Sequence, residues 1–124
     1  MSFNYDIRAN AAKNRLYLKL EGTMSEDDAR KVYETILAEI KKLKPGWAVV
    51  NDISALKPAD ENASEYLRKA QAASAKAGVK RVVRVVGSQS ITNLQWNRTL
   101  QETQGIRADV AASVADAEKL LDEG

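Results

Sequence analysis

Cysteine and histidine are both absent from this chain of 124 residues. Without cysteine there can be no disulfide, no thiolate nucleophile and no soft-metal site. Without histidine the chain lacks the side chain best suited to proton transfer near neutral pH, which is also the commonest metal ligand. The sequence also has no glycine-rich phosphate loop, no nucleophile elbow and no metal-binding constellation. We therefore expect a protein that is not an enzyme and that carries no metal and no other cofactor.

The chain is also short of net charge and of long apolar segments. Its formal net charge is only +2, so no strong field attracts nucleic acid or an anionic membrane. Lysine and arginine gather at residues 41–44 and 76–81, where they complement helix C-termini, and no aromatic residues are interleaved to stack on bases. No stretch approaches membrane-spanning length, and the first residues form no apolar leader. We expect a cytoplasmic protein with no nucleic-acid partner and no transmembrane segment.

The first half of the chain shows clear periodicity. Apolar and polar residues alternate over residues 3–9 and 16–20, which predicts two strands of an antiparallel hairpin. Ser25 followed by Asp28 predicts a capping box at the start of a helix that ends before the Pro-Gly pair at residues 45–46. The apolar run that follows, residues 47–50, is typical of a strand covered on both faces.

The second half alternates helices and strands. We predict an alanine-rich helix over residues 62–77, a strand at 82–86, a helix at 91–103, a weak strand at 107–112 and a last helix from 113 onward. The order is ββαβαβαβα. It indicates a single α/β domain over residues 1–124, with a mixed, mostly parallel sheet covered by helices.

Four segments carry a family resemblance. In order they are the turn Glu21-Gly22-Thr23-Met24-Ser25, the strand Val49-Val50-Asn51-Asp52-Ile53-Ser54, the helix start Asp60-Glu61-Asn62-Ala63 and the closing helix Ala117-Glu118-Lys119-Leu120-Leu121. Their order and spacing resemble the STAS domain of anti-sigma factor antagonists, in particular the SpoIIAA-like group of small stand-alone proteins. The resemblance covers nearly the whole chain and implies a bacterial regulatory domain.

The sequence departs from that family at its switch. Phosphorylatable members carry Asp-Ser-Ser-Gly where this chain has residues 60–63, so the resemblance places Glu61 at the switch serine and Asn62 beside it. Neither side chain can accept a phosphate. A helix N-terminus stabilises negative charge, and Glu61 supplies one fixed charge where phosphoserine supplies about two. The chain is then either held in a phosphate-like state or simply has an acidic first helical turn, which helices favour in any case.

A polar rim is predicted where parallel strands end, because ligands of open α/β sheets gather beyond those ends. This rim comprises Asn51, Asp52 and Ser54 from one strand, Ser88 and Ser90 from the next, and Asp60, Glu61 and Asn62 at the neighbouring helix start. It could hold a partner or a small ligand. Alternatively, these residues only cap helices and tighten turns.

Two further residues invite a functional and a structural interpretation. Arg84 lies in an apolar strand, where an unpaired charge is costly, so we predict an ion pair with Asp52, either structural or as part of an anion site. Trp96 lies in the predicted helix at 91–103, either at the edge of its apolar face or as an exposed anchor for a partner.

Two functions from different classes remain open. The first is a non-catalytic interaction module similar to STAS antagonists, binding a protein partner such as a regulatory kinase-like protein or a second copy of itself. The second is a carrier of a small ligand or lipid, because STAS domains resemble the lipid-carrying CRAL-TRIO domains in their winding and an alanine-rich helix leaves space. That second function depends on analogy between folds.

Overall fold

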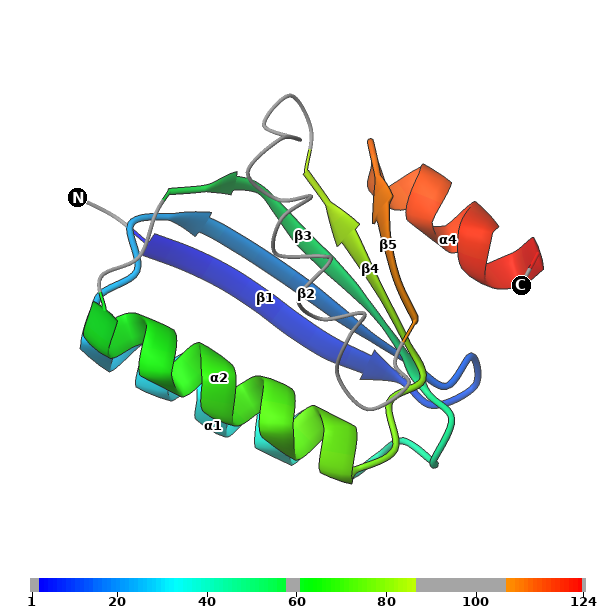
Figure 1. Cartoon of the computed structure of the whole chain (residues 1–124), viewed down its shortest axis with the longest axis horizontal. Helices are drawn as coiled ribbons and strands as arrows, with labels where there is room; N and C mark the ends of the chain where they lie inside the picture. The colour runs from blue at the N-terminus through cyan, green and yellow to red at the C-terminus, as the bar shows by residue number, and fades with distance from the viewer. Residues whose placement is uncertain (1–2, 58–60, 87–106, 124) are drawn as a thin grey trace.

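The computed structural model of the chain describes residues 3–57, 61–86 and 107–123 (Figure 1). Its elements, in chain order, are β1 Phe3–Asn10, β2 Arg15–Gly22, α1 Glu26–Ile40, β3 Ala48–Leu56, α2 Glu61–Lys76, β4 Arg81–Val85, β5 Arg107–Ala111 and α4 Val114–Glu123. This order confirms the predicted α/β class. The helix predicted at 91–103, with Trp96, lies outside the described residues.

The first two strands form the predicted hairpin. β1 pairs antiparallel with β2 over eight consecutive residue pairs, from Phe3 opposite Gly22 to Asn10 opposite Arg15. Asn14 closes the turn with a φ of 56°, a left-handed conformation that asparagine tolerates better than most residues. Its side chain also exchanges two hydrogen bonds with the backbone of Lys44, at 2.8 and 3.1 Å, which ties the turn to the end of the α1 segment.

The remaining strands add in chain order and run parallel. The sheet order is β1-β2-β3-β4-β5, and only β1 is antiparallel to its neighbour. β3 is longer than the apolar run that predicted it, because it continues to pair with β2 as far as Leu56 opposite Gly22. A register shift between Lys19 and Glu21 accommodates that extension. The predicted mixed, mostly parallel sheet is therefore confirmed.

The helix boundaries follow the local sequence signals. At α1, the Ser25 hydroxyl accepts from the Asp28 N–H and the Asp28 carboxylate accepts from the Ser25 N–H, each at 3.1 Å, which is the predicted capping box. Gly78 follows α2 with a φ of +97°. A β-carbon at that position would lie 2.9 Å from the Cα of Pro45, so only glycine fits there without displacement.

Two cores lie on the two faces of the sheet. On one face, α1 and α2 pack side by side against residues such as Leu16, Leu18 and Val49 (Figure 1). On the other face, α4 covers only part of the sheet and packs its Ala117 against a smaller core that includes Val50 and Val83. Among the described residues, α4 reaches β2 at Arg15 and Tyr17, and β1 has no helix over it on that face.

A polar cluster fastens α4 to β2, and we call it the α4 anchor: Lys13, Arg15, Tyr17, Glu118 and Asp122. Glu118 accepts hydrogen bonds from Lys13 Nζ at 3.1 Å, from Arg15 Nη1 at 3.0 Å and from the Tyr17 hydroxyl at 2.7 Å. Arg15 Nη2 donates to Asp122 at 2.8 Å. Burial alone would raise the pKa of Glu118, but its three hydrogen bonds together outweigh burial and lower that pKa below its usual value.

Candidate functional site

The described part of the rim lies at the end of β3. Asp52 Oδ1 accepts a hydrogen bond from the backbone N–H of Ser54 at 3.1 Å and another from its hydroxyl at 2.7 Å. These local bonds are the turn-tightening contacts that the structural alternative for the rim predicts. Asn51 precedes Asp52 and therefore faces the opposite side of the sheet, toward α1 and α2. The buried Oδ1 of Asn51 has no hydrogen-bond partner among the described residues. Consequently, the rim does not present all its polar groups in one direction.

The helix beside this rim begins where the resemblance places the switch. Glu61 is the first residue of α2, and Asn62 next to it is exposed. Ala63 is completely buried in the core between the helices and the sheet. The chain therefore has a carboxylate residue at the mouth of a helix anchored in the core. The other predicted rim residues, Asp60, Ser88 and Ser90, lie outside the described residues.

The sheet register contradicts the predicted ion pair between Arg84 and Asp52. Arg84 lies opposite Asn51, whereas Asp52 lies opposite Val85. Because successive residues of a strand face opposite sides, the Arg84 and Asp52 side chains leave opposite faces of the sheet. Arg84 is 6% exposed on the side of α1 and α2, and burial lowers its pKa. The prediction was wrong because apolar runs in the sequence do not show which residues of neighbouring strands pair.

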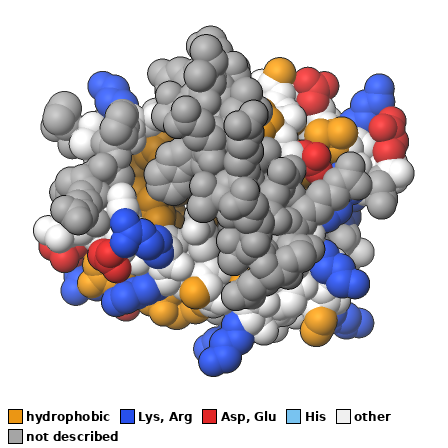
Figure 2. Space-filling view, viewed as in Figure 1, with side chains coloured by type: hydrophobic (Ala, Val, Ile, Leu, Met, Phe, Trp, Pro, Cys, Tyr) orange, Lys and Arg blue, Asp and Glu red, His pale blue; other side chains and the backbone are white. Residues whose placement is uncertain are grey.

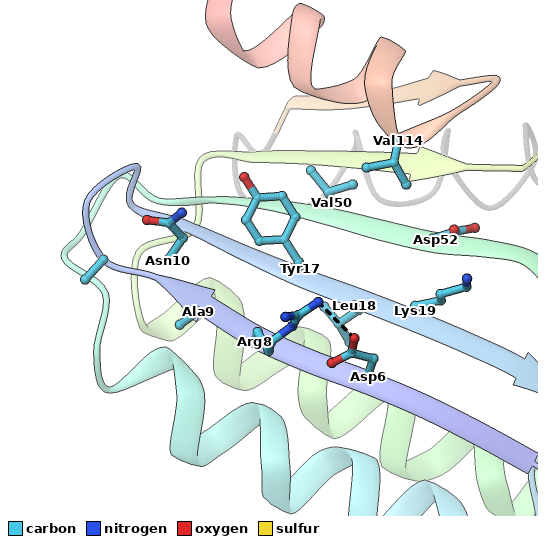
Figure 3. Close-up of a pocket in the computed structure, with 11 residues that line it drawn as sticks. Asp6, Arg8, Ala9, Asn10, Tyr17, Leu18, Lys19, Val50, Asp52 and Val114 are labelled. Carbon is cyan, nitrogen blue, oxygen red and sulfur yellow. Dashed lines mark hydrogen bonds and ion pairs between the residues drawn. The ribbon is translucent and has the colours of Figure 1, made fainter.

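Asp52 instead belongs to a groove on the α4 side of the sheet, which the sequence did not lead us to predict (Figure 3). The groove has a volume of about 680 Å³. Its polar lining comes from β1, β2 and β3, and Val114 at the start of α4 borders it. The residues that line it are Asp6, Arg8, Ala9, Asn10, Ala11, Tyr17, Leu18, Lys19, Val50, Asp52 and Val114.

Charges of both signs line the groove in equal number. Arg8 and Asp6 form an ion pair at 3.1 Å, with side chains 77% and 54% exposed. Lys19 bonds to Glu21 at 3.1 Å, and that hydrogen bond, followed by the charges of Glu21 and Asp52, raises the pKa of Lys19. Exposed ion pairs of this kind add about 0–1 kcal/mol of stability, so the fold does not depend on them. Because these side chains are exposed, each could exchange its present partner for an opposite charge on another molecule.

The described residues contain no group of three or more acids that could hold a metal ion. One signal in the sequence could have revealed the groove. Polar residues alternate along β1 and β2, and they include an aromatic residue and charges of both signs. The alternation puts these side chains on one face of the hairpin, which is therefore expected to be polar and in contact with solvent. In the view of Figure 2, the described lysine and arginine side chains lie at several separate places, and the described atoms in view show no single basic patch.

No helix among the described ranges is long and apolar enough to cross a membrane.

Comparison with known proteins identifies the fold. No family model matches the chain, and no curated protein matches it in sequence. Among solved structures, it is similar to an uncharacterized protein of the DUF3478 family with a SpoIIAA-like fold, from Shewanella loihica PV-4. The TM-score is 0.75 at 18% sequence identity, and the match covers 98% of this chain and 96% of the other. The strand order, the helix layers and this neighbour together show that the chain has a SpoIIAA-like fold of the STAS type.

Proposed function

We propose that this chain is a cytoplasmic, non-catalytic regulatory module that binds a protein partner through the end of β3 and the start of α2. The observation that carries the proposal is that α2 begins at Glu61. In the phosphorylatable proteins that this chain resembles, the residue in that place is a serine whose charge is switched. Here the charge is permanent. The module would therefore be constitutive, insensitive to a serine kinase at this position.

The helix geometry supports this proposal. A helix N-terminus carries a partial positive charge, so a carboxylate residue in the first turn is stabilised there. Ala63, two residues later, is fully buried and fixes the start of α2 against the core. Asn62 is exposed on the same turn and Ser54 is exposed at the end of β3. A partner that docks on these residues would meet a charge that no kinase can change.

The non-catalytic role rests on the side chains that the sequence supplies. Neither histidine nor cysteine occurs anywhere in the chain. Asp52, the described acid at the end of β3, already accepts two hydrogen bonds from Ser54. One oxygen of this carboxylate is therefore already occupied by local contacts.

The test compares charge removal at two helix starts. Glu61→Gln and Glu26→Gln each remove one negative charge from the first residue of a helix, α2 and α1 respectively. Each should change the free energy of unfolding by no more than about 1 kcal/mol. In pull-downs with the tagged full chain from cells of the native host, wild type and Glu26→Gln should recover the same stoichiometric partner. Glu61→Gln and Glu61→Ser should change its affinity.

Two outcomes would contradict this function. Equal partner affinity for all four proteins would leave Glu61 with a structural role only. Recovery of no stoichiometric protein by the wild-type chain, with no self-association in light scattering, would remove the interaction module altogether.

The groove favours a second candidate function, the binding of a small ligand. Its volume of about 680 Å³ lies within the range of about 300–1,000 Å³ that is typical of ligand sites. Its balanced charges would suit a polar, zwitterionic molecule rather than a lipid tail. The alanine-rich helix does not supply the space expected there, because Ala63 and Ala70 are buried in the core. Native mass spectrometry of freshly purified protein tests this function, and a mass equal to that of the bare chain would count against a tightly held ligand.

A further inference from the structure

Among the described residues, the sheet edge at β1 lacks several of the usual protections of an edge strand. β1 is the first strand in the sheet order, so its outer side pairs with no other described strand. It runs for eight residues, pairs with β2 without a bulge, and contains no proline and no lysine. Edge strands of natural proteins are commonly blunted by those devices, since an open edge is a template for another strand.

The outward backbone groups of this edge can be identified. The N–H of Ala9 donates to Glu39 Oε1 of α1 at 3.0 Å, so it points away from β2. Backbone groups alternate in direction along an antiparallel strand, and therefore those of Ile7 and Tyr5 also point outward. A second strand could pair with them. Glu39 occupies one end of this edge and must release Ala9 before an added strand can pair along its full length.

The side chains of β1 are self-complementary in one register only. If a second copy pairs antiparallel with Ile7 opposite Ile7, then Asp6 faces Arg8 of the second copy, and the converse pair forms by symmetry. A shift to either neighbouring register sets Asp6 directly opposite Asp6, or Arg8 opposite Arg8, and like charges directly opposite each other are destabilising. The exposed Asp6–Arg8 ion pairs, one within each chain, would be exchanged for two such pairs between the chains (Figure 3).

The remaining positions fit this register as well. Tyr5, 41% exposed and stacked on Phe3 at 6.0 Å between ring centroids, would lie opposite the small Ala9 of the second copy. Ile7, at the centre, points into the core between sheet and helices. Two copies would then join their apolar layers across the two-fold axis, in an interface that uses the same patch of both subunits.

The geometry points to a symmetric dimer in which β1 pairs antiparallel with β1 of a second copy, centred on Ile7, to give one continuous ten-stranded sheet. This interface is separate from the end of β3 and the start of α2, so it goes beyond the proposed function and does not depend on it. Glu39 and the β1 strand of the second copy compete for the Ala9 amide, so the Glu39 hydrogen bond weakens the dimer.

A charge-swap experiment tests the register. In sedimentation equilibrium over a dilution series, the wild-type chain should dimerise reversibly. Asp6→Arg and Arg8→Asp, each of which places like charges opposite each other, should weaken the dimer roughly 5- to 30-fold. The double variant Asp6→Arg/Arg8→Asp should restore wild-type affinity, and an equimolar mixture of the two single variants should form a heterodimer. Both side chains are exposed, so circular dichroism should show that all variants fold.

Two further measurements check the backbone pairing. Amide hydrogen exchange of Tyr5 and Ile7 should slow as the protein concentration rises, because those amides become bonded only in the dimer. Glu39→Ala should tighten the dimer by freeing the Ala9 amide, whereas Glu34→Ala, an exposed glutamate of the same helix, should not.

The following results would overturn the inference. A monomer throughout the dilution series would exclude the dimer. Equal dimerisation of the single and double charge variants, or exchange at Tyr5 and Ile7 that is independent of concentration, would exclude this register. The Glu61→Gln variant should dimerise like wild type, so failure of the partner proposal and failure of the dimer are separate results.

Discussion

Replacement of Glu118 by glutamine should loosen α4 and lower the stability of the whole domain. Glu118 is the centre of the α4 anchor and joins the last helix to Lys13, Arg15 and Tyr17. Glutamine has nearly the same shape but no charge: its amide oxygen can still accept from Tyr17 and Arg15, now as a neutral acceptor, while its NH₂ group would face the Lys13 ammonium. The change therefore removes interactions while it leaves the packing of α4 almost unaltered.

The expected loss can be added up from the three contacts. Loss of the charge weakens the Tyr17 hydroxyl bond and the partly buried pair with Arg15 by about 1 kcal/mol each, the difference between a charged and a neutral acceptor. The pair with Lys13, whose side chain is 50% exposed, contributes close to zero. Arg15 keeps its bond to Asp122, so it is not left alone. The total is about 2 kcal/mol, which corresponds to a Tm lower by about 6–10 °C for a chain of this length.

Urea unfolding followed by far-UV circular dichroism would measure this loss. The matched control is Glu123→Gln, which removes the same charge from an exposed residue of the same helix. Tyr17→Phe should lose about 1 kcal/mol, because it deletes only the hydroxyl bond to Glu118. If Glu118→Gln cost no more stability than Glu123→Gln, the α4 anchor would not hold the helix and the estimate would be refuted.

Two other predictions follow from the described contacts. The pKa of Glu118 is lowered from its ordinary value of 4.5 in the folded state, so its stabilisation is complete above that pH and is lost as the pH falls through the folded-state pKa. In a pH series of urea unfolding, the free energy of unfolding should fall at acid pH more steeply for wild type than for Glu118→Gln. An equal dependence on pH in the two proteins would contradict this prediction. Gly78→Ala should destabilise the fold by at least about 1 kcal/mol more than Gly46→Ala. Both glycines have a φ near +95°, but the added methyl group meets Pro45 at 2.9 Å only at Gly78, and thermal melts of the two variants would compare them.

Much of the fold could be predicted because its signals are local. The alternation along the hairpin strands, the Ser25–Asp28 capping box and the glycine after α2 each act within a few residues of the chain. The start of α2 was predicted within one residue for the same reason. The last helix, predicted from residue 113 onward, begins with a local contact of the same kind, because the Ser113 hydroxyl accepts from the Asp116 N–H at 3.1 Å.

The unpredicted features depend on contacts between distant residues. Arg84 and Asp52 were paired wrongly, because sheet register is decided by three-dimensional packing and not by either strand alone. The groove exists because α4 covers only part of the sheet, and no local sequence pattern predicts how much of the sheet a helix covers. The α4 anchor joins Arg15 to Glu118 across 103 positions of sequence. Arg15 and Glu118 each look like an ordinary surface charge when they are considered only with their neighbours in the chain.

The position of α4 constrains the order of events in synthesis. Val50 and Val83 are covered on one side by a helix that begins at Val114, near the end of the chain. While the ribosome still holds residues 114–123, the nascent domain must expose that apolar patch, even if the hairpin and the first two helices have already folded. Chaperone protection or premature aggregation should therefore centre on this patch.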